Sequence, residues 1–380
     1  STLKRVRLLL RNQFPLHPMS TKVAGTLPTL TKYSETSTFA FKKPIPTTPE
    51  LTSFTTEFLT RLGDIENKTK TSTLKSGRTY CYFDEATADN LPIVLAFHGV
   101  GQSKELWMQP EPMPNVRLIA IDRLGYGGSS QQPVPFSFGE AVKDYEEFLN
   151  NLGIDKFYVV GHSAGAPFAL QIATYLGDRV LGCASISATC DLYHRTAPTK
   201  GTMAWKNLVD SVMIANACSP NPGCCGGCIR NCILGNMLGG MMYTADKTKD
   251  CGFHSLYVDS ERKGDGGCER TWLAMDKKPF FVQTNLYSVM HSCNSKQTAL
   301  GDLWRVHMPW DYDVSTMQCP CVIYHGDPEL IRLNNAHQNQ KAMPNAKLQI
   351  LKGHGHTTIM MEAPTIIQAL VVGNVAEMVY

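Results

Sequence analysis

The apolar and polar positions of this 380-residue chain define two kinds of segment that follow one another. Short, nearly continuous apolar runs rich in β-branched and aromatic residues are typical of strands buried on both faces. Longer segments with apolar residues at helical spacing lie between them, and several end at a glycine. The pattern predicts strands over 91–99, 116–122, 156–160, 180–188, 319–326 and 346–353, and helices over 138–153, 166–177, 334–343 and 365–380. This alternation favours an α/β fold with a mostly parallel central sheet between layers of helices.

Two further elements precede this pattern. The segment 51–65 has the spacing of a short amphipathic helix, and 70–83 has the composition of two strands joined by a Ser-Gly turn. We therefore expect a hairpin at the start of the sheet.

The alternation stops after Cys190 and resumes near residue 317. We expect one α/β core made of 49–190 and 317–380, interrupted by a Cys-rich lid or cap insertion at 191–316. A separate second domain is the less simple interpretation, because the last two strands would then have no sheet to join. The segment 1–48 is expected to be an N-terminal extension.

The composition and net charge of the chain limit the kinds of binding partner that we expect. The chain is 43% hydrophobic and 18% charged, with a net charge of +3. That charge is small, and no basic block is interleaved with aromatic residues, so no nucleic-acid partner is expected. No segment approaches the roughly 20 apolar residues that span a bilayer, so no transmembrane segment is predicted.

The N-terminal extension has a composition of its own. Residues 1–34 contain no Asp or Glu, and basic residues and Ser or Thr are frequent there. This composition fits an organellar transit peptide or a disordered tail. We expect an intracellular location, in a mitochondrion or plastid if the segment is a transit peptide.

A serine lies between two glycines where the strand at 156–160 meets the following helix. The sequence Gly161-His162-Ser163-Ala164-Gly165 has the G-x-S-x-G pattern of a nucleophile elbow, in which a sharp turn exposes the serine hydroxyl. An ordinary tight connection would also use these residues, so the rest of the chain has to supply a base, an acid and an oxyanion hole.

Chemically reactive residues follow several other predicted strands. In an open parallel sheet, functional residues gather in loops at the carboxyl ends of the strands. Here those loops are His98–Gly101, Asp122–Ser129, the Ser163 turn, His325–Glu329 and Gly353–His356.

The motifs HGVG, DRLGYGGSS, GHSAG and the terminal GHGH, taken in this order, resemble the α/β-hydrolase superfamily over about residues 75–190 and 316–380. The segment 301–329 also looks like the stretch that leads from the lid into the acid-bearing strand of some small serine hydrolases. The resemblance implies the α/β-hydrolase fold, an inserted lid and a catalytic Ser163.

A serine needs a neighbouring base, and imidazole suits that role near neutral pH. The resemblance points to His356, which follows the last strand, with His354 as the competitor and more suited to a structural hydrogen bond. The acid that orients the imidazole is predicted to be Glu329, with Asp327 as the alternative acid or as a turn residue.

An oxyanion hole needs two backbone N–H donors. We expect them from Ala164, which follows the nucleophile, and from Val100, flanked by glycines that let the loop approach a substrate. The resemblance gives scaffold or loop-packing roles to four more residues: His98, Asp122, Arg123 and His162.

The serine restricts the reaction. Haloalkane dehalogenases and most epoxide hydrolases of the superfamily place Asp at the elbow, so Ser163 indicates acyl transfer. A small-molecule carboxylic ester is the expected substrate, cleaved through an acyl-enzyme. The alternatives are a thioesterase, a proline-type aminopeptidase or a C–C hydrolase, and, in another class, a non-catalytic ligand-binding protein on the same scaffold. The chemistry requires no metal and no organic cofactor.

Five cysteines crowd into the insertion between Cys218 and Cys232. Their spacing admits a zinc site through Cys225 and Cys228, but no second CxxC or nearby HxxxH accompanies it. It also admits disulfides, which need an oxidising compartment. We expect disulfides, because a glycine-rich segment with little core gains most from cross-links.

Overall fold

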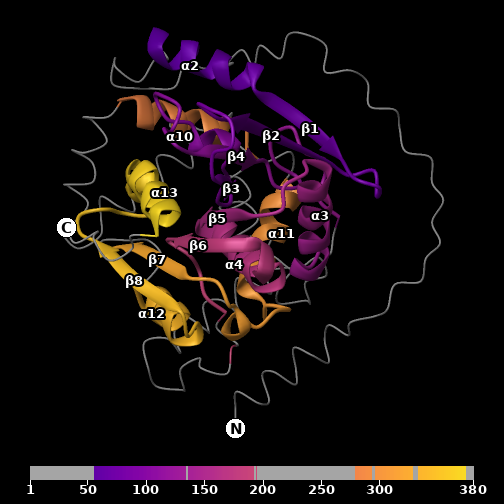
Figure 1. Cartoon of the computed structure of the whole chain (residues 1–380), viewed down its shortest axis with the longest axis vertical. Coiled ribbons are helices and arrows are strands. Elements are labelled where there is room, and N and C mark those ends of the chain that lie inside the picture. The colour runs from indigo at the N-terminus through magenta and orange to yellow at the C-terminus, as the bar shows by residue number, and fades with distance from the viewer. Residues whose placement is uncertain are drawn as a thin grey trace. The chain divides into compact units, whose positions relative to one another are not determined.

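A computed structural model of the chain describes residues 55–133, 136–191, 194, 279–292, 296–327 and 333–373. These residues build an eight-stranded sheet in the order β1-β2-β4-β3-β5-β6-β7-β8 (Figure 1). The strands are β1 (Thr69–Thr73), β2 (Thr79–Glu85), β3 (Ile93–Phe97), β4 (Arg117–Ile121), β5 (Phe157–His162), β6 (Val180–Ile186), β7 (Cys321–Gly326) and β8 (Ala346–Leu351). Strands β1 and β2 form the expected hairpin, β2 runs antiparallel to β4, and the pairs from β4 to β8 are parallel. The predicted mostly parallel sheet is therefore confirmed.

Helices cover both faces of the sheet. They are α2 (Thr56–Asn67), α3 (Phe138–Asn151), α4 (Ala166–Tyr175), α10 (Pro279–Met290), α11 (Lys296–His307), α12 (Leu333–Ala342) and α13 (Ala363–Val372). Residues of α3, α4 and α12 belong to one hydrophobic core, and residues of α2 and α13 belong to the other. Among the described residues, no helix is both long and apolar enough to cross a membrane.

The continuous apolar runs have a direct explanation in strand β3. Leu95 and Phe97 lie in the first core, while Val94 and Ala96 lie in the second. Successive side chains of a strand point to opposite faces, and both faces are covered here, so every position has to be apolar.

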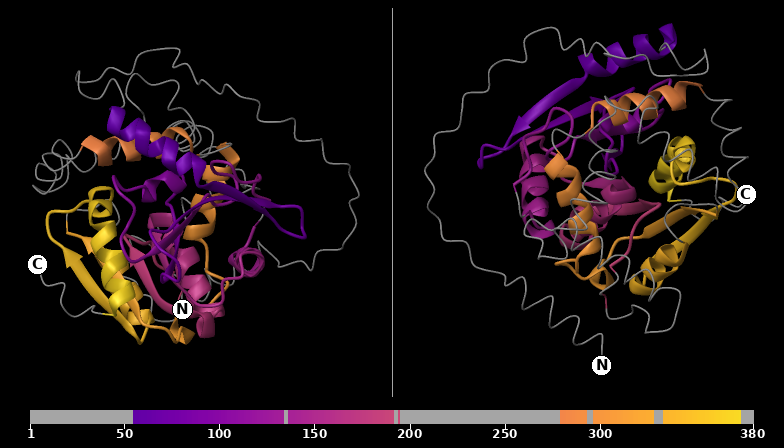
Figure 2. Two further views of the ribbon diagram at one scale, coloured as in Figure 1. Left: turned by 45° about the horizontal axis from the view of Figure 1, so that its top comes forward. Right: turned by 180° about the vertical axis from the view of Figure 1, so that it is seen from behind.

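Two helices of the predicted insertion pack against the core domain. Helix α10 lies beside α2 (Figures 1 and 2). The ring of Phe58 in α2 packs against those of Phe280 and Tyr287 in α10. Helix α11 contributes Val306 to the first core. Residues 195–278 lie outside the described residues, and so do the cysteines from Cys218 to Cys232 and the N-terminal extension. The expected disulfides and the domain boundaries stay predictions.

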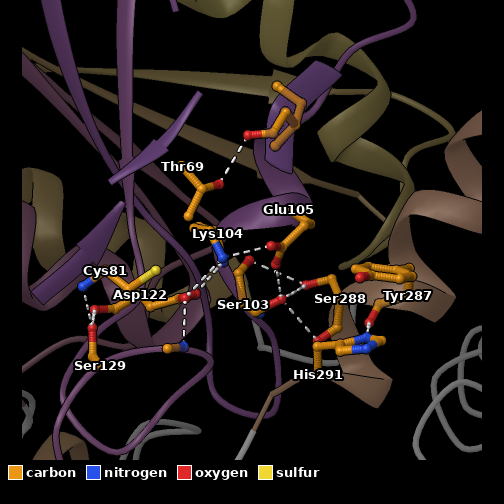
Figure 3. Close-up of polar contacts among 12 residues, drawn as sticks. Thr69, Cys81, Ser103, Lys104, Glu105, Asp122, Ser129, Tyr287, Ser288 and His291 are labelled. Atoms are coloured by element: carbon orange, nitrogen blue, oxygen red, sulfur yellow. Dashed lines mark hydrogen bonds and ion pairs between the residues drawn. The ribbon is translucent and has the colours of Figure 1, made fainter. Parts of the chain in front are cut away.

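A buried charge network connects the loop after β3 to the loop after β4 (Figure 3). Lys104, in the 3-10 turn η2 (Lys104–Trp107), lies 2.6 Å from Glu105 Oε1 and 3.0 Å from Asp122 Oδ2. Burial opposes the charge on Lys104, but the two carboxylates outweigh it and raise the pKa of Lys104 well above its usual range. Asp122 also accepts hydrogen bonds from the backbone N–H groups of Lys104 and Gly128. The network therefore fixes both loops, because each buried charge depends on its partners.

Replacing Lys104 by methionine should destabilise the fold strongly, since it leaves two buried carboxylates without their cation. We expect Lys104→Met to lower the free energy of unfolding by about 3–5 kcal/mol in urea denaturation. Lys70→Met is the matched control, because Lys70 pairs with Asp84 at 3.2 Å with half of its side chain exposed. That control should cost less than about 1 kcal/mol. Equal losses in the two variants would contradict a special role for the buried network.

Candidate active site

Ser163 lies at the turn between β5 and α4, in the short 3-10 segment η3 (Ser163–Gly165). Its φ is +54°, a left-handed conformation that non-glycine residues rarely adopt. Such conformations cost of order 1–3 kcal/mol and persist only where the surroundings enforce them. The predicted nucleophile elbow thus has the strained backbone that directs its serine away from the strand.

The two elbow glycines explain how the surroundings enforce this turn. A Cβ atom at Gly161 would lie 2.5 Å from the carbonyl oxygen of Gly165, and one at Gly165 would lie 2.4 Å from that of His98. Both clashes are with backbone atoms, so a side chain at either position would force β5, α4 and the loop after β3 apart.

His356 is the histidine that contacts the serine. Its Nε2 atom lies 3.0 Å from Ser163 Oγ, and both side chains are almost fully buried. His354 Nδ1 instead donates to the carbonyl oxygen of Thr358 at 3.1 Å. The last loop of the sheet therefore brings one of its two histidines to Ser163 and uses the other within the loop.

His162 connects the backbone of His356 to the loop after β3. Its Nε2 atom lies 2.9 Å from the carbonyl oxygen of His356, which can only accept, so Nε2 carries the proton. Its Nδ1 atom lies 3.1 Å from Oε1 of Gln102, an oxygen that accepts the Gly99 N–H at 3.0 Å. Gln102 thus joins the two loops on either side of Ser163, a role that the sequence pattern did not indicate.

The loop after β3 lies directly against the serine. A Cβ atom at Gly99 would lie 2.9 Å from Ser163 Cβ, and the parallel register of β3 and β5 pairs Phe97 with Gly161 at their ends. Val100 and Ala164 are both buried in the same core cluster. The two predicted oxyanion donors therefore lie on segments that border Ser163.

His98 is held as a neutral ring. Its Nδ1 donates to the carbonyl oxygen of Gly99 at 2.8 Å, and its Nε2 accepts the backbone N–H of Arg123 at 3.0 Å. Burial, together with the nearby Arg123 guanidinium, lowers the pKa of His98 well below its usual range. One tautomer is therefore fixed, and it serves to shape the loop.

The two candidate acids differ in what the structure describes. Asp327 Oδ1 accepts the backbone N–H of Gly353 at 2.6 Å and so closes the turn that precedes His356. Glu329 lies outside the described residues. Within the described ranges, no group of three or more His, Cys, Asp or Glu side chains is arranged to hold a metal ion.

Comparison with known proteins gives a family match and several relatives. Residues 92–222 match a sequence model of the alpha/beta hydrolase fold. Epoxide hydrolase B of Mycobacterium tuberculosis is 33% identical over 115 residues, which cover 29% of this chain and 32% of that protein. A haloalkane dehalogenase of Bradyrhizobium diazoefficiens is 29% identical over 104 residues, or 27% of this chain and 34% of that protein. The matched segment thus spans about a third of the length of these relatives.

Solved structures match over a larger part of the chain. An esterase from Exiguobacterium antarcticum has a TM-score of 0.55 at 15% identity, covering 80% of this chain and 98% of its own. An alpha/beta hydrolase fold protein from Chitinophaga pinensis also has a TM-score of 0.55, at 14% identity, covering 81% and 97%. With the sheet order and the serine turn, these matches show that the chain has the α/β-hydrolase fold.

Proposed function

We propose that the chain hydrolyses a carboxylic ester through an acyl-enzyme formed on Ser163. The observation that carries this proposal is the 3.0 Å contact between Ser163 Oγ and His356 Nε2. A serine hydroxyl becomes an effective nucleophile when an adjacent imidazole takes its proton, and the same imidazole later returns that proton to the leaving group. In the second half of the cycle, His356 activates the water that releases the acid.

The proposed oxyanion hole consists of the backbone N–H groups of Val100 and Ala164. Attack on the ester carbonyl places negative charge on its oxygen, and fixed backbone donors stabilise that charge without having to reorganise. Ala164 lies in the short segment that leads into α4, where the helix dipole also favours negative charge. The burial of both residues strengthens these interactions, because water is excluded.

The serine also supports acyl transfer over the reactions named for the curated relatives. An acyl group on Ser163 forms an ester, whose carbonyl carbon water can attack in the second step. Attack by a serine on an epoxide or haloalkane would instead form an ether, which has no such carbonyl and would trap the enzyme. Esterases among the solved structures with this fold support the same choice.

The predicted insertion 191–316 is proposed to be a lid over this site. Its described helices dock close to the loops that border the serine, since Ser103 N–H donates to Ser288 Oγ of α10 at 2.7 Å. Figure 3 shows this contact beside the buried Lys104 network. A small acyl substrate would then enter between the insertion and the carboxyl ends of the strands.

A panel of nitrophenyl esters with short to long acyl chains tests the proposal. We expect the wild-type protein to hydrolyse at least one of them and Ser163→Ala to lose activity by about 10⁶-fold, the effect of removing the serine from an intact triad. A fluorophosphonate probe should label Ser163 covalently, as mass spectrometry of the labelled peptide would show.

Ser185→Ala is the matched control for that experiment. Ser185 is a fully buried serine on the neighbouring strand β6, paired in register with Gly161. Its loss should leave hydrolysis near the wild-type rate. An unlabelled Ser163 in folded protein would refute the enzyme and favour a ligand-binding protein on the same scaffold.

The identity of the acid is tested by two neutral isosteres. Glu329→Gln should lower kcat by about 10⁴-fold, because a neutral amide no longer holds the imidazole in the required tautomer or stabilises its charged form. Asp327→Asn keeps an oxygen that can accept the Gly353 N–H, so its kcat should stay near that of wild type. Both variants are assayed after circular dichroism confirms folding. The opposite outcome would make Asp327 the acid.

A further inference from the structure

We propose that Asp302, on helix α11 of the predicted insertion, is a positioning residue for the oxyanion loop and acts through Arg123. The proposal rests on the proposed function, since it concerns how the Val100 N–H is aimed at the substrate oxygen. Asp302 reaches the loop through one intermediate side chain, and all of the groups involved are buried.

The peptide between Gly99 and Val100 is held by its carbonyl oxygen. That oxygen accepts from His98 Nδ1 at 2.8 Å and from Arg123 Nη2 at 3.0 Å. In a trans peptide, the C=O and the following N–H lie in one plane and point in opposite directions. Two donors on the Gly99 oxygen therefore fix the direction of the Val100 N–H, on the side away from Arg123.

Arg123 contacts the loop at two further points. Its Nε donates to the carbonyl oxygen of His98 at 3.0 Å, and its own backbone N–H donates to His98 Nε2 at 3.0 Å. The guanidinium thus binds two successive carbonyl groups as a planar fork, a geometry that a lysine ammonium does not reproduce.

Arg123 is itself nearly inaccessible, so its charge needs a partner inside the protein. Asp302 supplies it: the carboxylate Oδ2 lies 2.6 Å from Arg123 Nη1, and Asp302 is fully buried. The hydroxyl of Tyr126 donates to the same oxygen at 2.8 Å, and the ring of Tyr126 lies 4.7 Å from the guanidinium carbon. Burial opposes the charge of Arg123, but Asp302 outweighs it and raises the pKa of Arg123.

A second guanidinium makes the carboxylate hard to replace. Arg305 Nη1 donates to Asp302 Oδ1 at 3.0 Å, so one buried carboxylate lies between two buried cations. Without the charge of Asp302, the two guanidiniums repel each other. Arg123 is then drawn away from the carbonyl groups of His98 and Gly99, and the Val100 N–H loses its fixed direction.

The expected effect is on the transition state rather than on substrate binding. Oxyanion donors act on charge that develops during the reaction, so their misalignment lowers kcat and leaves KM nearly unchanged. Complete loss of one donor costs about 10²–10³-fold in kcat, and a misdirected donor should cost less. We expect Asp302→Asn and Arg123→Lys each to lower kcat by about 10–100-fold, with KM within about twofold of wild type.

The experiment uses the full chain, with activity expressed per fluorophosphonate-titrated site so that unfolded protein does not count. Inhibition by an alkyl boronic acid, which forms a tetrahedral adduct on serine, should weaken by about the same factor as kcat. Asp302→Glu keeps the carboxylate and should recover part of the lost rate. If Asp302→Asn does not fold, Arg123→Lys tests the proposal by itself. The lysine keeps a cation beside Asp302 and removes only the planar guanidinium that binds the two carbonyl groups of the loop.

Gln283→Leu is the control for a merely structural role of the insertion. Gln283, on α10, is buried and accepts from the backbone N–H and hydroxyl of Thr55, the residue that precedes α2. The kcat of the Gln283→Leu variant, expressed per titrated site, should match that of the wild-type protein. If Asp302→Asn and Arg123→Lys also keep the wild-type kcat and boronate affinity per titrated site, the inference is wrong. If wild-type Ser163 does not react with the fluorophosphonate, the proposed function fails first and this inference fails with it.

Discussion

The close approach of three backbone segments at the serine turn is the constraint on which the rest of the site depends. Strand β5, the start of α4 and the loop after β3 pass so near one another that neither Gly161 nor Gly165 has room for a Cβ atom. This packing holds Ser163 at its positive φ and places it against Gly99. The strain is local, and the two hydrophobic cores on either side of the sheet sustain it.

Buried polar groups then give the surrounding loops a single conformation. A buried charge without a partner costs free energy. A loop that carries a buried charge is therefore held in the conformation that brings this charge to its partner. Lys104 is held between Glu105 and Asp122, and Arg123 is held by Asp302. The loops after β3 and β4 owe their shape to these pairs, which reach helix α11 of the predicted insertion. We infer from this arrangement that the predicted insertion helps to shape the proposed site.

The fold and the residue at position 163 make separate contributions to the proposed site. The fold supplies a sharp turn at the end of β5, a histidine after β8 and a glycine loop after β3. None of these selects between an acyl and an alkyl substrate. In the proposed function, the residue at the turn makes this selection, because a serine gives an intermediate that water can hydrolyse only when the transferred group is an acyl group. The curated relatives named for epoxide and haloalkane chemistry match over about a third of their length.

Local patterns in the sequence determined the architecture and the nucleophile turn. Strands covered on both faces must be apolar at nearly every position, so β3 to β7 could be predicted from composition alone. The glycines around Ser163 marked the turn because no other residue fits there.

Tertiary structure decided which side chains meet. His354 and His356 lie two residues apart, and only the family resemblance favoured His356 in the sequence. The path of the last loop brings His356 to Ser163. Likewise, Asp302 and Arg123 belong to distant segments, and their pairing arises from the packing of α11 against the loop after β4. Such contacts follow from the completed fold, because no local propensity encodes which buried carboxylate will neutralise which buried guanidinium.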